Sequence, residues 1–210
     1  MSPIPRAYHH GDLRAALLAA GLELARGGVD AVTVREVTRV AGVSPNAAYR
    51  HFADHRSLVV AVALEAQGAL ADAMAARISA LSSGLEGPDA ALATLRGVGL
   101  GYIDFALAEP GWFKLALVTF DPSAGAAPAV TVAQSVPPPF QMLVDALDGM
   151  VAADLMTAAQ REHAEWPAWA AVHGFADIAT RGPLQGADPT MLSGLGVVVV
   201  DRIIAGISAA

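Results

Sequence analysis

"VREVTRVAGVSPNAAYRHFADHRSLVVAVA", residues 34–63, is the stretch that decides the fold. Thr33 precedes it and is a good N-cap for a short helix over 34–40, with Glu36 three residues later as in a capping box. Gly42 then supplies a sharp turn, because glycine adopts backbone conformations that other residues avoid. The first half of the stretch therefore predicts a short, capped helix that ends in a turn.

The residues after this glycine predict a second short helix over 44–52. Ser44 is its expected N-cap, and Pro45 lies in the first turn, where the missing N–H costs nothing. Phe52 closes the helix after two turns. Two short helices joined in this way form a helix-turn-helix, whose second helix enters the major groove of DNA by its N-terminal residues.

The second helix carries side chains suited to DNA. Small residues at its start let the backbone approach base edges, and the polar side chains that follow reach phosphates, as do free N–H groups at both helix N-termini. Tyr49 and Phe52 could instead belong only to the core of a helical bundle. Arg35 and Arg39, four residues apart, could form a solvated helix face.

Charge is distributed unevenly along the chain. The 210 residues include 13 basic and 20 acidic side chains, and the net charge of −7 by itself argues against nucleic acid. Residues 1–60, however, carry seven arginines and five acidic residues, a balance of +2, whereas the remainder balances to −9. This asymmetry predicts a small cationic module on a larger acidic body.

Composition excludes several classes of protein. Hydrophobic residues make up 54% of the chain, which is enough for a sizeable core, and the absence of cysteine excludes disulfides and thiolate metal sites. The longest uncharged run, Pro122 to Val144, contains five prolines and predicts no membrane span. The N-terminus does not resemble a signal peptide, so we expect a cytoplasmic protein without a membrane partner.

Apolar residues recur at helical spacing along the rest of the chain, which predicts an all-α fold. The first helix has a stripe of leucine and alanine from Leu13 to Leu24, and a helix capped by Asp54 runs on toward Ile78. Further helices are predicted over 88–108, 110–119, 137–153, 157–181 and 188–208, with a low-complexity loop over 121–139.

Motifs typical of enzymes are weak or missing. "GVGLG" at 97–101 lacks dinucleotide-binding spacing, and its glycines more plausibly allow close helix packing. "EHAEW" at 162–166 is not a zinc-protease motif, because His163 and Glu165 point to different faces of a helix. We therefore expect no catalytic activity, no cofactor and no metal.

The residues of this helix-turn-helix and its flanking helices resemble the TetR-type family of transcriptional regulators. The matching features are Thr33 at the helix start, Ala-Gly-Val-Ser at 41–44, Tyr-Arg-His-Phe at 49–52 and Leu58, and the match covers residues 8–65. The resemblance implies a three-helix DNA-binding domain in residues 1–55 and a larger helical ligand-binding and dimerisation domain in residues 56–210.

Two later segments resemble the subgroup of TetR C-terminal domains that is recognised by a Trp and then His-Gly. They are "YIDFALAEPGWFKLAL" at 102–117 and "WPAWAAVHGFADIATRG" at 166–182. Where the family usually has a lysine after the cap of the fourth helix, this chain has His55 and then Arg56. The DNA-binding residues that are expected in this way are Arg6, Thr33, Arg35, Ser44, Pro45, Asn46, Ala47, Tyr49, Arg50, His51, His55 and Arg56.

An effector pocket is expected among the later helices. Trp166, Trp169 and His173 share one helical face and could line a cavity for an apolar ligand with one polar group. His173 could instead be a satisfied core or interface histidine, with Asp177 four residues on as its partner. The expected pocket residues are Tyr102, Phe105, Trp112, Phe113, Phe120, Phe140, Trp166, Trp169 and His173.

A homodimer is expected because one short recognition helix reads too few bases for useful specificity. The resemblance implies a two-fold axis between the helices over 157–181 and 188–208. The last helix has an apolar stripe that could face the partner or could be buried within its own subunit. The expected interface residues are Leu192, Leu195, Val199 and Ile203.

These patterns predict a ligand-responsive DNA-binding regulator, most simply a repressor that releases a palindromic operator when a largely apolar small molecule binds. The alternative is a small-molecule-binding helical dimer with weak or no DNA binding, which the acidic body and the missing lysine favour.

Overall fold

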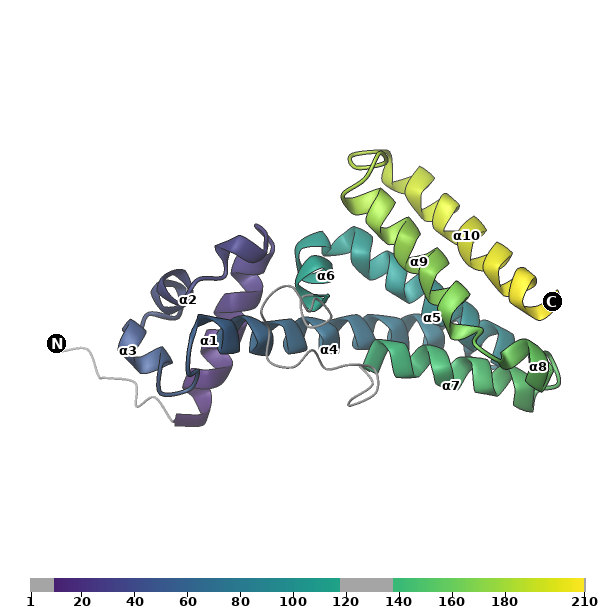
Figure 1. Cartoon of the computed structure of the whole chain (residues 1–210), viewed down its shortest axis with the longest axis horizontal. Helices are drawn as coiled ribbons and strands as arrows, with labels where there is room; N and C mark the ends of the chain where they lie inside the picture. The colour runs from purple at the N-terminus through teal and green to yellow at the C-terminus, as the bar shows by residue number, and fades with distance from the viewer. Residues whose placement is uncertain (1–9, 118–137, 210) are drawn as a thin grey trace.

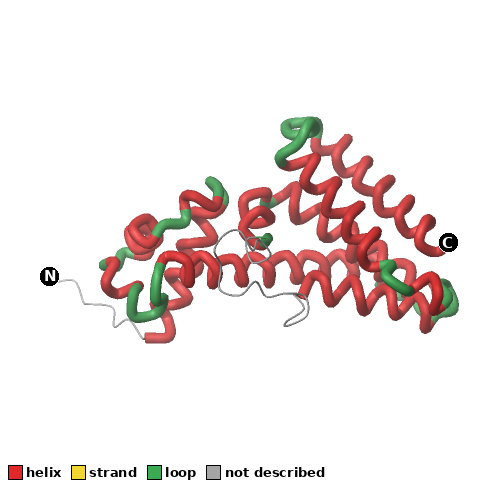
Figure 2. The backbone as a smooth tube through the Cα atoms, in the orientation of Figure 1, coloured by secondary structure: helices red, strands yellow, loops and turns green. Residues whose placement is uncertain are grey.

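The computed structural model describes residues 10–117 and 138–209, and within these ranges the chain forms helices and no strand (Figure 2). The all-α prediction is therefore confirmed. Most of the loop expected over 121–139 lies outside the described residues. The elements are α1 (His10–Ala25), the 3-10 helix η1 (Val29–Ala31), α2 (Val34–Ala41), α3 (Pro45–Ala48), α4 (His55–Ser82), α5 (Gly87–Ala108), α6 (Pro110–Ala116), α7 (Pro138–Ala152), α8 (Ala158–Arg161), α9 (Glu165–Thr180) and α10 (Pro189–Ala209).

The helix α4 runs along the length of the molecule (Figure 1). At one end it is joined by α1, α2 and α3, and toward the other end it packs against α5 and α7. The helices α9 and α10 lie side by side against α5, and the short helix α6 sits near the middle, where it contacts both α1 and α4.

The turn between α2 and α3 forms as predicted. The hydroxyl of Thr33 accepts a hydrogen bond from the backbone N–H of Glu36 at 3.2 Å, which caps α2. The carboxylate of Glu36 binds Arg39 at 2.7 Å. Gly42 ends α2 with φ 71°, a left-handed conformation that glycine adopts without steric cost.

The helix α3 is shorter than predicted. It has four residues, Pro45–Ala48, and Ser44 stands at its N-cap position without a capping hydrogen bond from its side chain. A turn continues from Tyr49 to His51, in which the N–H of Tyr49 still donates to the carbonyl of Pro45 at 3.2 Å. The segment up to Phe52 therefore keeps a helical path although the α-helix itself ends four residues earlier.

The start of α4 is firmly capped. Asp54 accepts a hydrogen bond from the N–H of Ser57 at 2.7 Å, and the hydroxyl of Ser57 accepts one from the N–H of Asp54 at 3.1 Å. The hydrogen bond from the Ser57 backbone is the main reason that the pKa of Asp54 lies below its usual value. This capping box fixes the direction in which α4 leaves the helix-turn-helix.

Two clusters of buried apolar residues hold the fold together, and α4 belongs to both. The N-terminal cluster spans residues 17–66 and also takes in Leu115 and Ala116 from α6. The C-terminal cluster begins at Leu70 on α4 and includes side chains from α5, α6, α7, α9 and α10. One continuous helix, α4, belongs to both clusters, so the clusters do not separate at its first residue. The expected domain division between residues 55 and 56 stays a prediction.

The prediction of a single helix over 157–181 is wrong, because the structure has two helices there, α8 and α9. Thr157 and Gln160 form a capping box that starts α8, and His163 then has φ 61°, which breaks the helical path. The second helix, α9, begins at Glu165, so Pro167 lies in its first turn. Proline is favoured at the start of a helix and breaks one in the interior, which explains the division.

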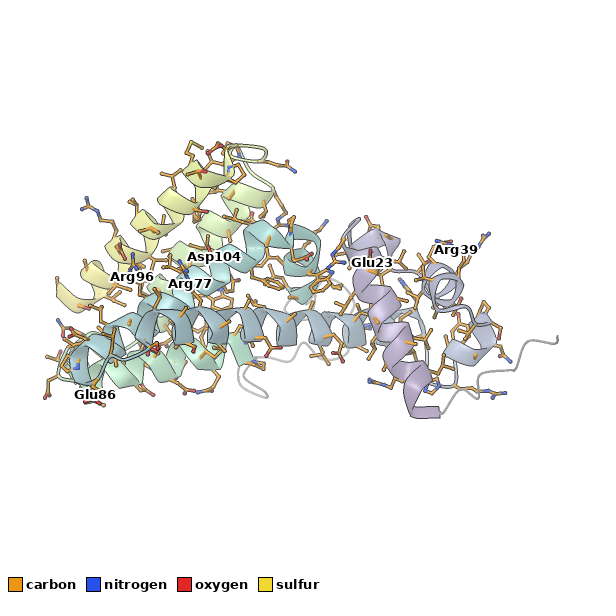
Figure 3. All side chains as sticks on the ribbon, turned by 180° about the vertical axis from the view of Figure 1, so that it is seen from behind. Glu23, Arg39, Arg77, Glu86, Arg96 and Asp104 are labelled. Atoms are coloured by element: carbon orange, nitrogen blue, oxygen red, sulfur yellow. The ribbon has the colours of Figure 1, made fainter. Side chains whose placement is uncertain are left out.

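Glycines let α5 approach α4 closely. A Cβ atom on Gly101 would lie 2.6 Å from the Cα atom of Met74, and one on Gly97 would lie 2.7 Å from the Cα atom of Ile78. Beside this contact Arg77 and Asp104 form an ion pair at 3.4 Å (Figure 3). The expectation that these glycines serve helix packing agrees with this geometry.

Three helices are long and apolar enough to cross a membrane by length and composition alone, namely α4, α5 and α10. None of them coincides with the longest uncharged run of the sequence, because each contains charged residues. In α5 the apolar residues serve the core, because 61% of its most apolar window is buried. In α10 that share is 22%, which leaves apolar surface exposed.

The contact between α4 and α5 can be tested with a matched pair of glycines. Gly101→Ala should lower the free energy of unfolding by about 1–3 kcal/mol, because the new methyl group overlaps the backbone of α4. Gly68→Ala, on the exposed side of α4 with no atom within 4 Å, should be neutral or stabilise by up to about 1 kcal/mol. Urea denaturation measures both, and equal effects would contradict the close contact.

Candidate functional site

Among the described residues, those expected to face DNA lie at the end of the molecule that carries α3 (Figure 1). The side chains of Ser44, Pro45, Asn46 and Arg50 are exposed, and Tyr49 is 52% exposed. The core interpretation of Tyr49 therefore does not hold.

Two neighbouring residues anchor this segment instead of facing outward. Ala48 and Phe52 are buried in the N-terminal cluster, and Arg14 of α1 lies over the Phe52 ring at 5.6 Å. Ala47 and His51 are half-buried beside them. The burial of one face holds the opposite face of α3 toward solvent.

The arginines of α2 differ in their surroundings. Arg39 pairs with Glu36 at 2.7 Å, whereas Arg35 is exposed and makes no ion pair with another described residue. The hydroxyl of Thr33, also expected at DNA, is already engaged in capping α2. Arg6 lies outside the described residues.

At the start of α4, His55 and Arg56 do not present their side chains freely for the phosphate contact that was expected there. The Nε2 atom of His55 lies 2.7 Å from the backbone carbonyl of Val32, so this nitrogen is used within the protein. Arg56 is half-buried, and its Nε and Nη2 atoms are buried without a hydrogen bond to any described residue. A DNA phosphate therefore cannot reach these two nitrogens in this conformation, because neither has accessible surface.

A small cavity lies between α4, α5, α7, α9 and α10. Its volume is about 30 Å³, far below the roughly 300–1,000 Å³ of a typical ligand site. All its lining side chains are uncharged. The lining residues are Met74, Leu95, Val98, Gly99, Tyr102, Pro139, Leu143, Ala168, Trp169, Val172, Val200, Ile203, Ile204 and Ile207.

Two of the expected pocket residues, Tyr102 and Trp169, line this cavity. Phe113, Phe140 and His173 do not line it but contact one or both of these rings, and Phe105 is buried in the core away from it. Trp166 is exposed and packs against Phe140, and Phe120 lies outside the described residues. The aliphatic lining was missed because valine and isoleucine carry no chemical signal beyond their inward helical spacing.

His173 has a different partner from the one expected. Its Nδ1 atom lies 2.9 Å from the hydroxyl of Tyr102, a hydrogen bond whose donor depends on the imidazole tautomer. Asp177 instead binds Arg181. Burial lowers the pKa of His173 below its usual value, Asp177 acts against this shift, and burial raises the pKa of Tyr102. Both side chains are therefore uncharged at neutral pH.

Trp112 does not line this cavity and lies at the junction with the helix-turn-helix, packed against both clusters. Its indole N–H donates to the carbonyl of Leu22 in α1 at 2.7 Å. The guanidinium of Arg26, just after α1, stacks on its ring at 4.7 Å and binds Glu109 through two hydrogen bonds of 3.1 Å. A Cβ atom on Gly111 would lie 2.2 Å from the carbonyl oxygen of Ala25. The helix α6 thus fits closely against the end of α1.

The expected interface stripe on α10 is turned partly inward. Leu192 is 7% exposed and belongs to the core, Ile203 lines the cavity, and Val199 packs against the core. Of the four residues, Leu195 is exposed, at 37%, and Val198 beside it is 52% exposed. The outward apolar face of α10 thus contains Leu195 and Val198, because the α9 and α5 contacts take the opposite face.

Among residues 10–117 and 138–209, no three His, Cys, Asp or Glu side chains come together as a group that could hold a metal ion. The expected sites offer surface charge around α3 and an apolar cavity between the later helices.

Two family models match the chain. The model described as bacterial regulatory proteins of the tetR family matches residues 17–62, and the model described as the tetracyclin repressor-like C-terminal domain matches residues 95–195. No curated protein matches the chain.

Solved structures share the whole fold. A protein of unknown function from Rhodococcus sp. RHA1 is 28% identical, with a TM-score of 0.74, and the match covers 96% of this chain and 98% of that one. A bacterial regulatory protein in the tetR family from Rhodococcus RHA1 is 19% identical, with a TM-score of 0.60 and coverage of 91% and 96%. A TetR family transcription regulator from Marinobacter aquaeolei VT8 is 20% identical, with a TM-score of 0.61 and coverage of 91% and 94%.

The chain belongs to the TetR family, and its fold and domains are those of a DNA-binding transcriptional regulator. This membership points to a regulator and not to an enzyme. The resemblance to the Trp/His-Gly subgroup stays a prediction.

The partial burial of His173 makes stability depend on pH. The folded protein holds the imidazole proton less tightly than the unfolded chain, whose pKa is about 6.5. Stability is thus complete above that value and falls as the pH decreases through it toward the lower folded pKa.

His173→Gln should therefore flatten the loss of thermal stability between about pH 8 and about pH 5 relative to the wild type. Exposed His163→Gln should retain the wild-type slope. Midpoints of unfolding followed by circular dichroism measure both variants, and an unchanged slope in His173→Gln would contradict this role of burial.

Proposed function

We propose that the protein is a cytoplasmic, homodimeric repressor that binds a palindromic operator and releases it when a largely apolar small molecule enters the cavity. The observation that carries this proposal is the position of α6, which contacts the cavity wall and the DNA-binding helices at the same time.

The proposed DNA contacts come from the exposed side chains around α3. Arg35 in α2 and Arg50 just after α3 are exposed cations at the same end of the molecule. Tyr49, next to Arg50 in the chain, is also exposed and presents a hydroxyl group. Side chains of these types bind phosphates and thereby set the position of a recognition helix on the duplex. The local balance of +2 supports this surface although the whole chain is acidic.

The proposed effector is uncharged and mainly apolar, because uncharged residues line the cavity and the Tyr102 hydroxyl is already bound to His173. The volume of about 30 Å³ holds no drug-sized molecule, so the walls have to move when one binds. An effector of this kind favours a second, expanded conformation, and only its higher affinity for that conformation shifts the equilibrium.

The helix α6 offers the route by which this expansion reaches DNA. Phe113 meets the ring of Tyr102 edge to face at 5.3 Å. The neighbouring Trp112 is bound to the carbonyl of Leu22, and Leu115 is buried among residues of α1 and α4. A displacement of Tyr102 would therefore press on α6 and shift the helix-turn-helix with it.

The proposed dimer uses the outer faces of α9 and α10. Leu195 and Val198 on α10 and Ile178 on α9 are exposed large apolar side chains, an unfavourable arrangement in water. A two-fold axis through this face would bury them against the same residues of a second copy. Two recognition helices about 34–36 Å apart would then read a palindrome.

One observation favours the alternative of a small-molecule-binding dimer without strong DNA binding. His55 stands where a lysine is usual, and its Nε2 atom is used by the carbonyl of Val32. A mobility-shift assay on DNA flanking its own gene separates the two functions, because the alternative predicts no retarded complex.

The coupling can be tested without knowing the effector, by filling the cavity with a side chain. Ala168→Phe places a ring among the lining residues and should weaken operator binding by about 5- to 150-fold, the range of typical coupling energies. Adding Trp112→Phe removes the hydrogen bond to Leu22 and should restore part of the affinity. Fluorescence anisotropy with labelled operator measures the affinity of the single and the double variant.

Two controls accompany this experiment. Ala76→Phe, at an exposed position of α4, should leave operator affinity unchanged, and Trp166→Phe should not restore it. If Ala168→Phe folds and binds the operator as tightly as the wild type, the proposed route through α6 is wrong.

The dimer face predicts a change in oligomeric state. Leu195→Arg combined with Val198→Glu should give folded monomers that no longer bind the operator, because two charges would be buried in the interface. Leu64→Arg, at an exposed leucine of α4, should remain dimeric. Analytical ultracentrifugation distinguishes these outcomes, and a wild-type monomer at micromolar concentration would refute the dimer.

A further inference from the structure

The first turn of α3 carries a restricted set of side chains. Pro45 and Asn46 are exposed and Ala47 is half-buried, whereas Ala48 is buried in the N-terminal cluster. Ser44 precedes them and is exposed without a capping hydrogen bond from its side chain. The part of this helix that is free to meet a base edge thus consists of one amide, one hydroxyl and two small apolar groups.

These groups match one kind of base pair. An asparagine amide donates to N7 and accepts from the N6 amino group of adenine in the major groove, a bidentate pairing. Small apolar side chains such as Ala47 pack against the C5 methyl group of thymine. Guanine is read mainly by arginine or lysine and cytosine by carboxylates, and residues 44–48 contain none of these.

The long cations near α3 are placed for the DNA backbone. Arg50 follows α3 by two residues, and Arg35 lies in the first turn of α2. Asn46 lies three residues before Tyr49 and four before Arg50, and the hydrogen bond from Tyr49 N–H to the carbonyl of Pro45 keeps helical spacing there. Base reading and phosphate binding therefore occupy successive turns of one face.

We propose that the base pairs contacted by the first turn of α3 in each operator half-site are A·T, with adenine bound by the Asn46 amide and thymine methyl groups packed against Pro45 and Ala47. This inference rests on the proposed DNA-binding function of the same face, and it names the sequence class that this face recognises.

The test begins with selection of binding sites by the full-length protein from a random duplex library. Two base analogues are then placed in the selected operator: 7-deazaadenine, which lacks the N7 acceptor, and deoxyuridine, which lacks the thymine methyl group. At one adenine in each half-site, 7-deazaadenine should weaken wild-type binding by about fivefold or more. In Asn46→Ala the same analogue should have no effect at that position, because the contact has already been removed.

Two further variants test whether Arg50 contacts phosphate and whether Asn46 contacts the base. Arg50→Ala should weaken normal and modified operators by the same factor, since it contacts phosphate and not bases. Asn46→Arg should change the preferred base pair at the sensitive position from A·T to G·C in a repeated selection. Both positions are exposed, and circular dichroism verifies that the variants remain folded.

The outcomes separate this inference from the function on which it rests. If the library yields no preferred sequence, DNA recognition by this face is refuted together with the inference. If a palindrome is selected but no adenine in it responds to 7-deazaadenine through Asn46, the repressor proposal stands and the A·T assignment is wrong. Deoxyuridine that binds as tightly as thymidine at every half-site position would refute the methyl contact.

Discussion

The packing of α6 into the N-terminal cluster is the contact on which the rest of the structure depends. Leu115 and Ala116 are buried among residues of α1 and α4, and the amide of Gln67 donates to the carbonyl of Ala116 at 2.9 Å. Gly111 meets the carbonyl of Ala25 so closely that a larger residue would not fit. A bundle of three short helices buries little apolar surface alone, and this contact completes its core.

Through this contact, α6 connects the N-terminal helices to Tyr102 in the wall of the cavity. The residues of α6 alternate in their partners: Phe113 meets Tyr102 at the cavity wall, and Trp112 binds the carbonyl of Leu22. The helix α10 is divided in the same way, with Ile203 lining the cavity and Val198 exposed on the opposite face. Each of these helices therefore joins two surfaces that the proposed function uses together.

Local signals predicted most of the secondary structure. The cap by Thr33, the turn at Gly42 and the cap by Asp54 are confirmed, because each depends on groups within a few residues of one another. The helix over 157–181 is wrong because His163, with φ 61°, interrupts the helical path and a separate helix, α9, begins at Glu165 with Pro167 in its first turn. Ser44 stands at the predicted N-cap position of α3 but makes no capping hydrogen bond, since a suitable residue type does not ensure that its side chain makes this bond.

The sequence by itself determined the helix-turn-helix and the all-helical class, since local hydrogen bonds and helical periodicity specify them. Only the tertiary structure decided the partners of Trp112 and His173 and the inward position of Leu192. The residues that meet Trp112 and His173 lie 90 and 71 positions away along the chain. In α10, apolar residues occur on both faces of the helix, so periodicity could not indicate which face packs inward.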